Sequence, residues 1–180
     1  MMKIYELKND SDTYKWLETK EDKEAVEFNG LSLVDKWVPW EVTTSKKKRE
    51  LPDSPALCAG VKVVNDKTKR ILENVLQNEV EFLPLNHPSE SFWIIHVINV
   101  VNAVDYDTAI PFRATPTIIT HFKKHGFYEG KLANQWIFKL PEMPLTRIYV
   151  TEIFKEVIEQ NKLTGFKFEE VWDSESEGGD

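Results

Sequence analysis

Apolar residues recur at every second position in several short stretches of the chain, which predicts β-strands. We expect such strands at 3–7, 61–64 and 80–85, and Pro84 places the third of them at a sheet edge because proline has no backbone donor. We expect further strands at 117–122, 135–140, 147–150 and 166–172. Glycine and proline residues separate the later strands, so connections of hairpin length are expected between them.

In two other segments the apolar residues recur with the spacing of an α-helix. One apolar stripe runs through the first segment, 66–78, and a second stripe lies between Thr151 and Gly165. Asp66 or Thr68 is expected to cap the first helix, and Thr151 the second, by accepting from free backbone N–H groups. Gly165 is expected to end the second helix in a left-handed conformation.

The stretch 92–104 is the most apolar part of the chain. As a strand it is apolar on both faces, so we expect it to be covered on both sides and central in its sheet. His96, Asn99 and Asn102 interrupt it, and it is shorter than the ~20 apolar residues that a membrane-spanning helix needs. The start of the chain, 1–8, becomes charged before an apolar signal region forms. These features predict no membrane association.

The order of the elements predicts the fold class α+β, with a single domain over 1–172. Its mostly antiparallel sheet would carry about two main helices packed on it. A chain of 180 residues suits one domain. Residues 173–180 are acidic and contain no apolar side chain, which predicts a disordered tail.

Composition narrows the classes of function. Cys58 is the single cysteine, so an intrachain disulfide is impossible, and this fits a reducing cytoplasm. The formal net charge of −7 disfavours nucleic-acid binding, which needs a basic surface. It suits either solubility or a basic protein partner. The chain also contains no glycine-rich phosphate loop, and no cofactor is expected.

Several segments, in this order, resemble the MXAN-0049-type immunity proteins of bacterial polymorphic toxin systems. They are Leu72–Val75 with Glu81–Leu85, Val97–Asp105, Trp136–Leu140, and Ile148–Phe154 with Asn161–Phe166. The resemblance covers about residues 60–172. It implies a protein that is made beside a toxin and binds it so that the producing cell survives, and it does not imply a catalytic site. We therefore expect a cytoplasmic protein that neutralises its cognate toxin by occlusion, with that toxin encoded by an adjacent gene. The acidity would suit a basic toxin such as a nuclease. The resemblance carries no binding residues and no oligomeric state.

Two pairs of residues are candidates for contact with the toxin. Trp37 and Trp40 lie in a region of weak periodicity, where incompletely buried rings would make good interface anchors, although packing in the core also explains them. Asp105 and Asp107 follow the apolar stretch and form the best acidic pair in the chain. Their carboxylates would equally serve to accept from backbone N–H groups in a turn.

A small metal-dependent hydrolase is the alternative function. It would use Asp105 and Asp107 together with histidine. His121 and His125 are four residues apart, but phenylalanine follows His121 where a zinc protease has glutamate. His96, inside the apolar stretch, is expected to be a structural histidine with little access to solvent. Cys58 has no evident catalytic base in the sequence.

Overall fold

Two antiparallel sheets form the centre of the protein in the computed structural model, which describes residues 1–22 and 26–176. The first sheet has the strand order β11-β1-β10-β9, and the second has the order β4-β6-β5. The strands of the first are β1 (Lys3–Asn9), β9 (Ile137–Phe138), β10 (Tyr149–Thr151) and β11 (Phe166–Asp173). Those of the second are β4 (Lys62–Asn65), β5 (Val80–Leu85) and β6 (Phe92–Val97).

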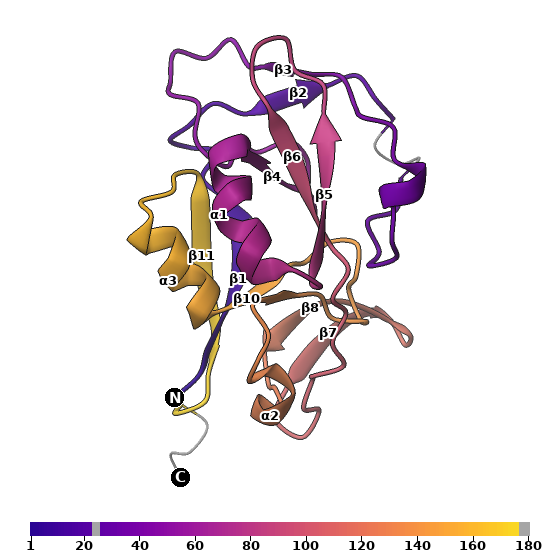
Figure 1. Ribbon diagram of the computed structural model, residues 1–180. Helices are drawn as coiled ribbons and strands as arrows, with labels where there is room; N and C mark the ends of the chain where they lie inside the picture. Colours follow the sequence, from indigo (N-terminus) through magenta and orange to yellow (C-terminus); the bar gives the residue numbers. More distant parts are fainter. Residues whose placement is uncertain (23–25, 177–180) are drawn as a thin grey trace.

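Two small two-stranded sheets extend this body at opposite ends (Figure 1). One joins β2 (Leu17–Thr19) to β3 (Val42–Thr44), and the other joins β7 (Ile110–Thr115) to β8 (Ile118–Lys124). The helical elements are η2 (Val34–Lys36), α1 (Asp66–Leu76), α2 (Glu129–Leu132) and α3 (Glu152–Gln160). The predicted class is confirmed: the protein is a single α+β domain with mostly antiparallel sheets. Pro84 lies in β5, an edge strand as predicted.

The two main helices bury their apolar stripes in one shared core. α1 packs against β4 and β6, and α3 packs against β1 and β10 (Figure 1). Leu72 and Leu76 of α1 meet Phe154 and Ile158 of α3 in a cluster that also contains side chains from both sheets. Full burial of each such side chain stabilises the fold by about 1.5–3 kcal/mol. This cluster therefore joins the two sheets into one body.

β6 is covered on both faces, as its sequence predicted. Ile95 and Val97 belong to the cluster with the helices, whereas Phe92 and Ile94 pack with the N-terminal segment on the other face. The strand ends at Val97, so the expectation of a strand reaching residue 104 was wrong.

Long-range hydrogen bonds turn the chain away from the second sheet after Val97. The backbone N–H groups of Ile98 and Asn99 both donate to the carbonyl of Glu79, at 2.9 and 3.1 Å. Val101 N–H then donates to the carbonyl of Lys139, beside the first sheet. Residues 98–104 therefore connect the second sheet to the first. Ala103 and Val104 are buried in a hydrophobic cluster that contains no residue of β6.

The helix termini differ in detail from expectation. Asn65, rather than Asp66 or Thr68, caps α1: its side chain accepts from the backbone N–H of Thr68 at 2.9 Å. Thr151 occupies the N-cap position of α3 as predicted, but its hydroxyl donates to the carbonyl of Gln135 at 2.7 Å. Gly165 has a φ of 89°, but it does not end α3 as expected: the helix ends at Gln160, and the left-handed residue after its C-cap Asn161 is Lys162, with a φ of 52°.

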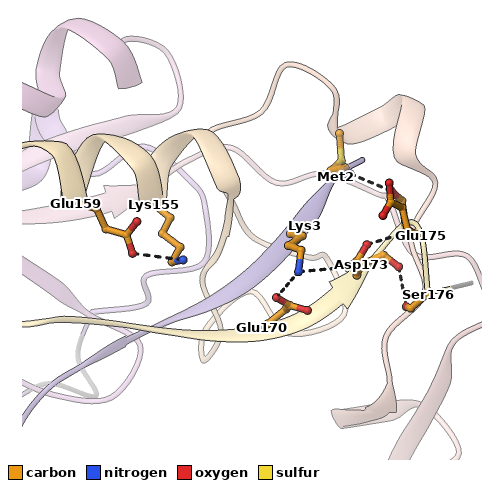
Figure 2. Close-up of polar contacts among 9 residues, drawn as sticks. Met2, Lys3, Lys155, Glu159, Glu170, Asp173, Glu175 and Ser176 are labelled. Atoms are coloured by element: carbon orange, nitrogen blue, oxygen red, sulfur yellow. Dashed lines mark hydrogen bonds and ion pairs between the residues drawn. The ribbon is translucent and has the colours of Figure 1, made fainter.

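The two ends of the described chain are held together across β1 and β11. Lys3 Nζ lies 3.0 Å from a carboxylate oxygen of Glu170 and 3.2 Å from one of Asp173 (Figure 2). The backbone N–H of Ser174 donates to the carbonyl of Met2 at 3.0 Å. The first residues of the predicted disordered tail are therefore structured: Asp173 is the last residue of β11, and 174–176 form a turn. Residues 177–180 of that tail lie outside the described residues.

His125 follows β8 and is packed among aromatic rings. Its ring centroid lies 5.3 Å from that of Phe122 and 5.8 Å from that of Phe127, and its Nε2 lies 3.3 Å from the hydroxyl of Tyr149. Burial, with a smaller contribution from the charge of Arg147, lowers the pKa of His125 to about 4, although Glu169 opposes the change. The folded protein therefore keeps this imidazole neutral at pH values where a free histidine is charged.

We expect an NMR titration to find the pKa of His125 near 4. The unfolded state takes up this proton near the ordinary histidine pKa of about 6.5, whereas the folded state does not. The free energy of unfolding should therefore fall as the pH drops from about 6.5 towards 4, and His125→Gln should weaken that dependence relative to wild type. A His125 pKa above 6 in the folded protein would contradict this assignment.

Candidate partner-binding pocket

The irregular segment 26–40 forms most of a pocket of about 580 Å³ beside the second sheet. We call it the Trp pocket. Its lining residues are Glu21, Val26, Glu27, Asn29, Leu31, Leu33, Lys36, Trp37, Val38, Pro39 and Trp40. Within this segment η2 is the one regular helix, and it packs against β5. The conformation of the pocket therefore depends on contacts with the sheets behind it.

Three side chains from the sheet region bind the backbone of this segment. Lys139 Nζ, just after β9, donates to the carbonyl of Phe28, and Nε2 of His96, on β6, lies 2.7 Å from the carbonyl of Leu31. The carboxylate of Glu81, on β5, accepts from the backbone N–H of Leu33 at 2.8 Å and also from the hydroxyl of Ser32. We call Glu81, His96 and Lys139 the anchor residues.

Two anchor residues are almost fully buried. Lys139 and His96 each expose 1% of their surface. Burial lowers the pKa of Lys139 to about 8, and burial is also the main cause that lowers the pKa of His96. Because a carbonyl oxygen can only accept, Nε2 of His96 carries the proton in this contact. His96 therefore acts as a donor that positions Leu31, in agreement with the structural role expected for it.

The two tryptophans contribute differently to the Trp pocket. Trp40 is buried, whereas Trp37 is half-buried and its Nε1 donates to the carbonyl of Pro84 on β5 at 2.8 Å. The two ring centroids lie 5.4 Å apart. Leu31 and Val38 line the pocket and are 68% and 74% exposed. An exposed apolar rim around a fixed tryptophan is typical of an interaction site.

The acidic pair lies elsewhere and forms a turn. Asp105 Oδ1 accepts from the backbone N–H of Asp107 at 3.0 Å, and its Oδ2 lies 3.3 Å from the hydroxyl of Thr108. The carboxylate of Asp105 thus accepts a backbone hydrogen bond within a turn, which is one of the two roles that the sequence suggested for this pair. Asp107 is exposed. Neither aspartate lines the Trp pocket. The structure brings Trp37 and Trp40 together and leaves the aspartates apart from them.

The candidate catalytic side chains do not converge. His121 stacks on Phe112 with ring centroids 4.6 Å apart, and Cys58 packs at the edge of the cluster beneath the Trp pocket. Within residues 1–22 and 26–176, no group of three or more histidine, cysteine, aspartate and glutamate side chains is placed to hold a metal ion. The described part of the chain therefore offers no assembled ligand set for the hydrolase alternative. In the same part, no helix has both the length and the apolarity to cross a bilayer.

A smaller pocket of about 200 Å³ does bring His121 and His125 to one place. Glu6, Arg147 and Glu169 also line it, and Arg147 Nη1 lies 2.5 Å from Glu6 Oε1. Arg147 lies two residues before β10, so this ion pair joins β1 to the start of its neighbouring strand. Sequence reasoning missed it because the two residues are 141 positions apart.

Sequence reasoning also missed most of the Trp pocket. It identified Trp37 and Trp40 but gave no role to Leu31, Val38 or Glu27. One signal was available: exposed apolar residues recur at Leu31 and Val38 in a stretch that has neither a helical nor a strand period. Isolated apolar residues in an irregular segment do not by themselves predict a pocket, because such residues are common on protein surfaces.

Removal of one anchor residue should make local opening of the segment 26–40 more frequent. In Glu81→Ala the backbone N–H of Leu33 loses a hydrogen bond to a charged group, which contributes about 1.5–3 kcal/mol. We expect the Leu33 amide to exchange with solvent at least about tenfold faster, as measured by native-state hydrogen exchange. Glu73→Ala is the matched control, because Glu73 is an exposed carboxylate on α1 that pairs with Lys69. Unchanged exchange at Leu33 in Glu81→Ala would argue against the anchor role.

Comparison with known protein families identifies the family of this chain. The sequence model of the immunity protein family Imm11 matches residues 12–173, which is most of the chain. The match confirms the resemblance seen in the sequence and reaches further towards the N-terminus, so that it includes the Trp pocket. No curated protein matches the chain in a direct comparison. The protein belongs to the immunity protein family Imm11.

Proposed function

We propose that the protein binds a cognate bacterial toxin and neutralises it by covering the toxin's active surface. Membership of an immunity protein family supports a toxin as the partner. The Trp pocket is the observation that carries the choice of surface, since it combines an exposed apolar rim with a fixed tryptophan. We place this binding in the cytoplasm and propose that an adjacent gene encodes the toxin.

The anchor residues support a surface that is ready to bind. Binding surfaces that are ordered before association lose less conformational entropy when the complex forms. Leu31 and Leu33 are each held through the backbone by an anchor residue, and Trp37 is held through its indole nitrogen. The partner would therefore meet the side chains of the Trp pocket already in position.

Charge supports a basic partner. The net charge of −7 would speed the encounter with a basic toxin through electrostatic steering. Asp107 is exposed and stays a proposed second contact, whereas Asp105 would act indirectly by holding the turn that presents Asp107. We propose Trp37 as the principal contact and Trp40 as the buried ring that supports it.

The first test uses the product of the neighbouring gene. Purified protein should bind that product in a stoichiometric complex, as measured by calorimetry, and co-expression should restore the growth of cells that produce it. An interface of about 800 Å² on each partner would be sufficient for such a complex. Failure of both binding and rescue would count decisively against toxin neutralisation by this chain.

The second test asks whether Trp37 contacts the toxin. Trp37→Ala should weaken toxin binding by about 30-fold or more, because tryptophans at interface centres commonly contribute at least 2 kcal/mol. Trp16→Ala is the matched control, since Trp16 is also half-buried but does not line the Trp pocket. Equal effects of the two substitutions would assign the binding surface to another face. Circular dichroism of both variants should show that the fold persists.

A further inference from the structure

The Trp pocket has an acidic side as well as an aromatic one. Glu21 and Glu27 line it and are exposed, and Lys36 is the one cation among the lining residues in the described part of the chain. The charged lining is therefore net negative. No cation among residues 1–22 and 26–176 forms an ion pair with either glutamate. The carboxylate of Glu27 accepts from Asn29 Nδ2 at 3.4 Å, and both glutamates are exposed at the pocket.

The aromatic side is fixed in orientation. The Nε1 group of Trp37 is committed to the carbonyl of Pro84, so the indole cannot rotate freely. Its ring meets Trp40 at 5.4 Å and Phe28 at 6.2 Å between centroids, and these two buried rings support it from behind. The face of an indole attracts a cation because its π electrons carry partial negative charge. A half-buried tryptophan that lines the same pocket as two glutamates is therefore suited to a cationic side chain.

We propose that the Trp pocket accepts an arginine side chain of the partner toxin. The identity of the partner rests on the proposed function, whereas the chemistry of the pocket does not. The guanidinium would stack on the face of Trp37 and lie within reach of the carboxylate of Glu27. The aliphatic part of the side chain would contact the apolar rim at Leu31 and Val38.

Arginine fits this lining better than the other side chains that could enter it. A purely apolar side chain would leave the two glutamates unused, and an acidic one would be repelled by them. Lysine carries its charge on a compact, strongly hydrated ammonium group, whereas the planar guanidinium stacks on aromatic rings and binds carboxylates through two N–H groups. The volume of about 580 Å³ leaves room for an arginine with part of the adjoining backbone.

The test needs no toxin. The indole Nε1–H signal of Trp37 in the full-length, ¹⁵N-labelled protein can be followed by NMR while N-acetyl-arginine amide is added. N-acetyl-citrulline amide is the matched probe, because citrulline has the shape of arginine without its charge. We expect the Trp37 signal to shift saturably with the arginine probe, at dissociation constants in the millimolar range typical of a single small group, roughly 1 mM or weaker. The citrulline probe should bind at least about fivefold more weakly, since it lacks the cation–π and ion-pair contributions.

Substitution of Glu27 then measures how much its charge contributes to binding of the arginine probe. Glu27→Gln should weaken binding of the arginine probe by about threefold or more and leave citrulline binding unchanged, whereas Glu73→Gln, on α1 and outside the pocket, should change neither. Glu27 is exposed, so its substitution should not unfold the protein. Equal affinity for the two probes, or an unmoved Trp37 signal, would overturn the proposal. Either result could occur while the toxin still binds, so failure here is distinguishable from failure of the proposed function.

Discussion

The need to satisfy the backbone of an irregular segment shapes this protein more than any other constraint. Residues 26–40 form little regular structure, so their carbonyl and N–H groups cannot all bond within a helix or sheet. The anchor residues reach out from the two sheets and supply the missing partners. Burial of Lys139 is unfavourable by itself, and its bond to the carbonyl of Phe28 offsets part of that cost. The Trp pocket exists because these contacts hold the segment in one conformation.

The second sheet can position Glu81 and His96 because it is itself fixed from both sides. β6 has apolar side chains on each face, so α1 and α3 cover one face and the pocket segment covers the other. His96 lies on this strand, and Glu81 lies on its neighbour β5 at the position paired with it. Packing of the helices against this sheet therefore helps to fix the positions of Glu81 and His96, and β5 also holds Trp37 through the carbonyl of Pro84. The proposed binding of a toxin would benefit from this arrangement, because little ordering would remain to be done on association.

The polar residues of the described chain serve mainly to connect segments. Asp105 holds a turn, Glu79 accepts from the backbone N–H of Ile137 at 2.8 Å, and His125 stays neutral among aromatic rings. Each of these groups was a plausible participant in chemistry when seen as a residue type alone. Their contacts instead explain how short strands from distant parts of the chain form one body. This use of polar side chains is compatible with membership of an immunity protein family.

The sequence by itself determined the two main helices, most strands and the class of fold, because the periods of α1, α3 and β6 are local properties of the chain. It gave no sign of the short elements β2, η2 and α2. It missed β7, whose residues are mostly exposed and include Pro111, so no alternation marks them. It extended β6 too far, since the turn after Val97 depends on the carbonyls of Glu79 and Lys139. The tertiary structure alone decided the Trp pocket: Lys139 lies 111 positions from the carbonyl of Phe28, and no local pattern encodes a contact across that distance.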